Sequence, residues 1–141
     1  MTFMIIHKTR NYIFPVLLFF ILSGLDFINT SPYTLYVFEG SDWCSNCRRL
    51  ENTVLAKEEF LDFLSKREIA IHKIDFPQRI KQSKEEKKIN AAIAELYAFD
   101  GSFPTLILAK TNAQNFEKVF YSNQSVSQMQ QQIIDKLKLL Q

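Results

Sequence analysis

Two cysteines, Cys44 and Cys47, separate two contrasting stretches of this 141-residue chain. Residues 34–38 before them form an apolar, aromatic and β-branched run, which predicts a buried strand. After them, apolar residues recur at roughly helical spacing up to residue 55, which predicts an amphipathic helix. The first turn of a helix offers unpaired backbone N–H groups and the positive end of the helix dipole, and both stabilise a thiolate. We therefore expect Cys44 to be nucleophilic.

The composition suits one domain with a substantial core. Hydrophobic residues make up 47% of the chain, and its 141 residues are few for two domains. The formal net charge is only +2, with 17 basic and 15 acidic residues spread along the sequence. This pattern lacks the basic footprint of a nucleic-acid-binding protein, so we expect no nucleic-acid partner.

The N-terminal stretch has the character of a targeting segment. Two basic residues precede an apolar run over residues 12–25, which is the order found in export signals. The run is shorter than the roughly 20 apolar residues of a bilayer span. We predict a signal peptide within residues 1–30, with an uncleaved membrane anchor through residues 12–28 as the alternative, followed by a domain over 31–141. The cysteines would then work in the periplasm or another extracytoplasmic space, where disulfides persist.

The stretch after the cysteines continues with alternating helix and strand patterns. A second helix is expected over residues 57–66 and a β-branched strand over 69–75. Strand, helix and strand at this spacing predict a parallel pair joined by a crossover. Residues 78–88 then hold five basic and two acidic residues. We expect a solvated helical face or loop there, with a partner-binding role for the basic residues as the alternative.

The last third of the chain predicts a helix, a hairpin and a closing helix. The helix is expected over residues 89–97, and strands over 105–109 and 118–121 would pair antiparallel. Ser125 and Gln128 resemble a capping box at the start of the final helix. The apolar stripe of that helix consists of Val126, Met129, Ile133, Leu137 and Leu140. Together these patterns predict an α/β fold with a mixed sheet of about four strands flanked by helices.

Three features together resemble the thioredoxin superfamily: the W-C-x-x-C motif over residues 43–47, the Phe103-Pro104-Thr105 segment, and the order of elements over 34–140. The stretches 38–44 and 75–78, with the lysine-rich stretch that follows, more closely resemble a group of exported bacterial thioredoxin-family proteins. In that group the stretch between the second strand and the cis-proline is longer than in cytosolic thioredoxin, as it is here.

The resemblance implies a thioredoxin-like fold and thiol-disulfide exchange without a cofactor. Cys44 would attack a substrate disulfide and Cys47, one turn further into the helix, would resolve the mixed disulfide. Thiolate pKa values at such sites fall to about 3.5 to 7.5. The segment with Pro104 would carry a cis bond and offer backbone groups to an extended substrate. The residues expected to contact substrate are Trp43, Phe103, Pro104 and Thr105.

This chain departs from the thioredoxin pattern near the resolving cysteine. Thioredoxins carry a buried Asp six residues before the first cysteine, whereas this chain has Phe38 there. Glu39 follows, but alternation along a strand turns it to the face opposite residue 38. The sequence therefore does not predict a proton acceptor for Cys47. The intervening Ser45 and Asn46 match neither thioredoxin nor the strong periplasmic oxidants, so the redox potential does not follow by matching.

Other uses of the two cysteines are less well supported. A structural disulfide closing so short a loop gains little chain entropy. A zinc site normally wants four ligands, and the chain has only His7 and His72 besides the thiols, so we expect no metal. The alternative is a non-catalytic thioredoxin-fold module that binds a peptide, or copper(I) through its thiolates.

We predict an exported thiol-disulfide oxidoreductase, more reductase- or isomerase-like than a strong oxidant. Its substrates would be disulfide-containing exported proteins. With no third cysteine in the chain, recycling requires another protein or a small thiol, for which a membrane electron-transfer donor is the natural candidate. We expect a monomer.

Overall fold

The computed structural model describes residues 31–111 and 115–141, so the predicted signal or anchor within 1–30 lies outside the described residues. In chain order the elements are β1 (Tyr33–Glu39), α1 (Ser45–Leu50), the π-helical turn η1 (Glu51–Leu55), α2 (Glu58–Lys66), β2 (Ile69–Asp75), α3 (Lys84–Leu96), β3 (Thr105–Lys110), β4 (Phe116–Val119) and α4 (Val126–Leu139). Among the described helices, none has the length and apolar character needed to cross a bilayer.

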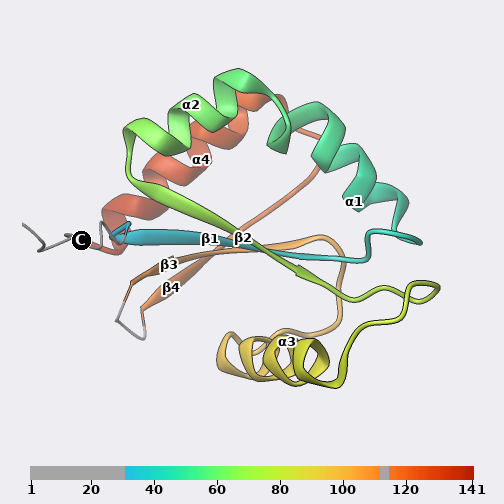
Figure 1. The fold of residues 1–141 in the computed structure, drawn as a ribbon. Coiled ribbons are helices and arrows are strands. Elements are labelled where there is room, and N and C mark those ends of the chain that lie inside the picture. Colours follow the sequence, from blue (N-terminus) through green and yellow to red (C-terminus); the bar gives the residue numbers. More distant parts are fainter. Residues whose placement is uncertain (1–30, 112–114) are drawn as a thin grey trace, which may run out of the picture.

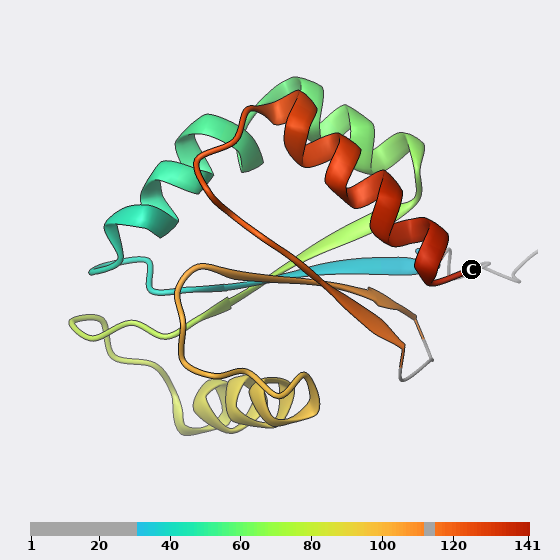
Figure 2. The same ribbon diagram turned by 180° about the vertical axis from the view of Figure 1, so that it is seen from behind.

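The four strands form one mixed sheet in the order β2-β1-β3-β4. β1 pairs parallel with β2, whereas β1 with β3 and β3 with β4 pair antiparallel. Helices α1, α2 and α4 cover one face of the sheet and α3 covers the other (Figures 1 and 2). This arrangement confirms the predicted mixed sheet of four strands flanked by helices.

The fourth strand begins and ends two residues earlier than the predicted range 118–121. It starts at Phe116, opposite Ala109, and ends at Val119, opposite Leu106. Beyond that point the backbone of Phe120 bonds to the side chain of Gln132 on α4, which donates to its carbonyl and accepts from its N–H. These bonds take residue 120 off the sheet, and local propensity does not reveal them.

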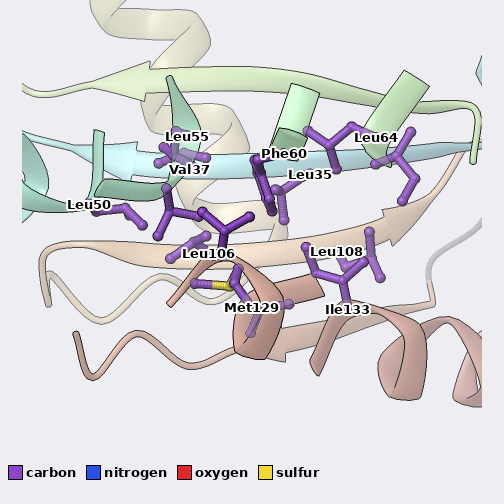
Figure 3. Packing of buried hydrophobic residues seen from close by; sticks show 14 of the residues in the cluster. Leu35, Val37, Leu50, Leu55, Phe60, Leu64, Leu106, Leu108, Met129 and Ile133 are labelled. Carbon is purple, nitrogen blue, oxygen red and sulfur yellow. The ribbon is translucent and has the colours of Figure 1, made fainter. Parts of the chain in front are cut away.

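The main core lies between the sheet and the three helices α1, α2 and α4. Leu35 and Val37 of β1 point into it, as residues two apart on a strand do. Figure 3 shows these side chains meeting those of the helices. The predicted apolar stripe of α4 is buried throughout. Burying one such side chain fully contributes roughly 1.5–3 kcal/mol, so this layer holds α1 against the sheet.

A smaller cluster lies under α3 on the other face of the sheet. Its buried members are Phe38, Ile74, Tyr97, Ile107 and Ala109. Helix α3 begins at residue 84, five residues before the predicted range, because Ser83 and Glu86 form a capping box. The charged stretch 78–88 is thus a loop up to Gln82 and a helix from Lys84 onward.

Candidate active site

The two cysteines form a disulfide across the first turn of α1. Their Cα atoms lie 5.3 Å apart, and Cys44 is the N-cap residue of the helix. The Cys44 Sγ accepts a hydrogen bond from the backbone N–H of Cys47 at 3.1 Å. Cys44 is 6% exposed and Cys47 is 2% exposed, so both side chains are largely covered in the oxidised state. The predicted strand-to-helix junction is confirmed.

A tight turn brings Trp43 and Phe103 together beside the disulfide-bearing turn of α1. The carbonyl of Gly40 accepts hydrogen bonds from the N–H groups of Trp43 and Cys44 at 3.2 and 2.8 Å. A Cβ at Gly40 would collide with the indole ring, so only glycine permits this approach. The Trp43 Nε1 donates to the carbonyl of Phe76 at 2.8 Å. The indole meets the Phe103 ring edge-on, with centroids 5.1 Å apart.

The segment that follows Phe103 enters β3. The Phe103–Pro104 peptide bond is cis, as the resemblance implies. Thr105 begins β3 opposite Phe38 of β1, and its hydroxyl donates to the carbonyl of Ser102 at 2.7 Å. All three residues of the Phe103-Pro104-Thr105 segment are half-buried. Their contact with a substrate remains a prediction.

A cavity of about 260 Å³ joins Cys47 to a carboxylate that the sequence analysis did not assign. Its lining consists of Glu39, Ser41, Cys47, Arg48, Glu51, Asn52 and Lys73. The expectation that Glu39 and Phe38 lie on opposite faces is right. The implication that Glu39 turns away from the cysteines is wrong, because Phe38 belongs to the cluster under α3 and Glu39 continues the row of Leu35 and Val37 beneath the helices. The two-residue alternation groups Glu39 with Leu35 and Val37, but the sequence does not tell which face of the strand lies under α1.

Burial is the main influence on the pKa of Glu39 in this cavity. Burial raises the pKa of Glu39, Lys73 lowers it, and Asp75 and Glu51 raise it further, so the net pKa lies above its ordinary value. The Lys73 Nζ lies 2.6 Å from a Glu51 carboxylate oxygen, so Lys73 also forms an ion pair with Glu51. Glu39 is therefore the carboxyl group beside Cys47 whose proton affinity is increased.

Among residues 31–111 and 115–141, no group of three or more His, Cys, Asp or Glu side chains is placed to hold a metal ion. His72 is exposed on β2, and its ring lies 5.7 Å from that of Tyr36.

No protein-family model matches the chain. The disulfide bond reductase DsbH of Chlamydia pneumoniae is 29% identical to it over 90 residues, which are 62% of this chain and 51% of that protein. The chain thus spans about half the length of this relative. A DsbH oxidoreductase structure superimposes with a TM-score of 0.65 at 23% identity, covering 77% of this chain and 74% of the other. A thioredoxin from Thermus thermophilus gives a TM-score of 0.49 at 17% identity, over 73% and 72% of the two chains.

Proposed function

We propose that this chain, which has the thioredoxin fold, is a thiol-disulfide oxidoreductase that cycles between a Cys44–Cys47 disulfide and the corresponding dithiol. The observation that supports this most directly is the disulfide across the first turn of α1, with Cys44 as the N-cap. On reduction, the unpaired N–H groups and the dipole of that turn stabilise a thiolate at Cys44. The relationship to a disulfide bond reductase supports the same chemistry.

In the reducing direction the cycle has two exchange steps. The Cys44 thiolate attacks one sulfur of the substrate disulfide and forms a mixed disulfide, and the other substrate sulfur leaves as a thiolate. Cys47 then loses its proton and attacks the Cys44 sulfur, which releases the second substrate thiolate. Two electrons pass from the protein dithiol to the substrate, and the protein ends as the disulfide. Cys47 suits the second step because it lies in the first turn of α1, three residues after Cys44, and is the less exposed of the two.

Glu39 is the proton acceptor in this proposal. It lines the same cavity as Cys47, and its raised pKa makes it a stronger base than an ordinary carboxylate once it is ionised. A thiol near its ordinary pKa of about 8.5 is mostly protonated at neutral pH, so its attack benefits from a nearby acceptor. The positive charge of Lys73, which pairs with Glu51, lowers the pKa of Glu39 and so opposes part of the effect of burial.

Two cysteine variants of the full chain test the assignment. Cys47→Ser should accumulate a covalent mixed disulfide with a protein substrate such as insulin, because the resolving thiol is missing. Cys44→Ser should form no such adduct and should show no turnover. Full insulin reduction by Cys44→Ser would refute the proposal, and stoichiometric copper(I) binding without exchange would favour the binding module instead.

The direction of exchange follows from the reduction potential of the cysteine pair. Titration against glutathione with Trp43 fluorescence as the readout measures it. A value near that of thioredoxin, about −270 mV, would indicate an electron donor to other proteins, whereas one near about −120 mV would indicate an oxidant. The name of the Chlamydia relative supports the reducing direction.

Export and the partners outside the cytosol belong to the same proposal. The support is the basic and apolar pattern of residues 1–30, together with a chemistry that needs disulfide-bearing substrates. The substrates would be exported proteins, and a membrane electron-transfer donor would return the protein to its dithiol form. The protein would act as a monomer. Fractionation of a bacterial host that expresses the full chain, with N-terminal sequencing of the product, tests both export and cleavage.

A further inference from the structure

A carboxylate two residues before Cys44 holds the loop that follows β2. The two carboxylate oxygens of Asp42 accept the backbone N–H groups of Gln78, Arg79 and Ile80, at 3.0, 2.6 and 2.9 Å. Burial raises the pKa of Asp42, but these three hydrogen bonds outweigh it, so the net pKa lies below its ordinary value. The carboxylate is therefore ionised and bonded to the loop at neutral pH.

Neighbouring hydrogen bonds extend this attachment along the whole turn before α1. The backbone N–H and hydroxyl of Ser41 donate to the two carboxylate oxygens of Asp75 at 2.8 and 2.6 Å. The Trp43 indole adds its bond to the carbonyl of Phe76 at 2.8 Å. Both ribbon views show the loop after β2 running beside the turn that enters α1 (Figures 1 and 2). The loop after β2 thus lies next to the turn that leads into Cys44.

The exposed side chains of this loop include two basic residues and no acidic one. Arg79 and Lys81 are exposed, and Ile80 between them is 61% exposed. The ion pairs in the described part of the chain involve none of the basic residues between 76 and 90. The two acidic residues in that stretch, Glu85 and Glu86, are both exposed on α3, and Glu86 accepts the backbone N–H of Ser83 in the capping box. Residues 76–82 themselves therefore present two positive charges and no negative one, and the nearby Asp42 carboxylate is taken up by backbone N–H groups of the same loop.

We propose that residues 76–82, the clamped loop, form a docking surface for acidic segments of substrate proteins beside their disulfide. This proposal rests on the proposed exchange function and adds the substrate class. Arg79 and Lys81 attract the acidic side chains, while Ile80 offers an apolar contact. Because Asp42 ties the loop to the turn before Cys44, a segment bound there brings its disulfide to the attacking sulfur. Charge complementarity of this kind acts mainly on the rate of association and on partner choice.

The experiment compares two disulfide-bonded peptides that differ only in the residues flanking the bond, Asp and Glu in one and Asn and Gln in the other. Reduced full-chain protein is mixed with each, and Trp43 fluorescence follows its oxidation. The protein dithiol becomes the disulfide as the peptide disulfide becomes two thiols. We expect the acidic peptide to react about tenfold faster at low salt. The difference should close in 1 M salt, where the Debye length falls to about 3 Å.

Three variants locate the effect, with the ratio of the two peptide rates as the readout. Arg79→Gln combined with Lys81→Gln should lower the ratio at least about threefold, since steering scales with the local field. The matched control, Lys57→Gln with Lys66→Gln, removes two exposed positive charges from α2 and the residue before it and should leave the ratio unchanged. Asp42→Ala should also lower the ratio. By charge alone, loss of an acidic group would raise it, so a fall reports that Asp42 positions the loop.

Each negative outcome has a distinct meaning. Equal rates for the two peptides would overturn the docking proposal and leave the exchange function intact. No reaction with either peptide, or with neutral bis(2-hydroxyethyl) disulfide, would refute the exchange function itself. A preference that survives the Arg79 and Lys81 changes would overturn the assigned location. Binding to anionic lipid vesicles that depends on these residues, without a peptide preference, would make the loop a membrane contact and overturn the proposal.

Discussion

Replacing Glu39 by Gln isolates the proton transfer from Cys47. The amide keeps the size of the side chain but cannot accept a proton from a thiol at neutral pH. A positioned general base contributes about 100- to 10,000-fold, and Glu39 is only partly buried in the cavity that it shares with Cys47. We therefore expect the lower end, a slowing of about 100-fold in the attack of Cys47 on the mixed disulfide. The preceding attack by Cys44 should be unchanged.

A symmetric nitrophenyl disulfide, mixed with reduced protein at one equivalent, separates the two steps in a stopped-flow experiment. The first coloured thiolate appears when Cys44 attacks, and the second appears when Cys47 displaces the remaining aryl thiolate. In Glu39→Gln the first phase should match wild type and the second should be slower. The matched control is Glu59→Gln, which neutralises an exposed carboxylate on α2 and should leave both phases unchanged.

The pH dependence adds a second readout. In wild type, the second phase should rise as Glu39 loses its proton, at a pH above its ordinary pKa of 4.5 because burial raises that pKa. In Glu39→Gln this rise should vanish. The raised pKa also means that the folded state holds the proton more tightly than the unfolded chain, so ionised Glu39 lowers stability as pH rises through that pKa. The variant should thus be at least as stable as wild type at neutral pH. A second phase within about twofold of wild type would refute the assignment.

Other consequences of the structure are open to measurement. Lys73→Met removes the ammonium group that lowers the pKa of Glu39, and it leaves the Glu51 carboxylate without this ion-pair partner. The rise of the second phase with pH should therefore move to higher pH in the stopped-flow experiment. Gly40→Ala forces a Cβ into the neighbouring indole and should cost about 1–3 kcal/mol of unfolding free energy in a urea titration. Ile133→Ala opens the main core and should cost about 2–5 kcal/mol, against less than about 0.5 kcal/mol for exposed Leu139→Ala. Equal losses for that last pair would contradict the packing described for α4.

Features set by neighbours in the sequence were predicted well. The change from an apolar, β-branched run to a helical period around Cys44 predicts the strand-to-helix junction, and the spacing of Ser125 and Gln128 predicts the capping box that starts α4. Ser83 and Glu86 have the same spacing, but the charged run around them hides it, so the start of α3 was missed. Local hydrogen bonds in these caps need no knowledge of the fold, which explains why they can be read from spacing alone.

Features set by residues far apart were not predictable in the same way. The bonds from Asp42 to the loop after β2 depend on the parallel register that brings Glu39 opposite Asp75. The end of β4 depends on Gln132, twelve residues beyond Phe120. Placing Glu39 in the cavity with Cys47 needed knowledge of which face of β1 lies beneath α1. Each of these is a long-range pairing, and a single sequence carries no direct record of such pairings.

The position of Glu39 bears on how proteins of this kind are compared. Its carboxyl group lies five residues before Cys44, whereas the thioredoxin pattern puts an acid six residues before the first cysteine. If an alignment is anchored on the first cysteine, it places Phe38 opposite the thioredoxin acid. The proposed proton acceptor then appears to be missing. The face of the strand decides which residue reaches the cavity, so an insertion or deletion of one residue in the turn moves the acid in the alignment without moving it in space. Relatives that seem to lack the acid should therefore be searched one residue to either side.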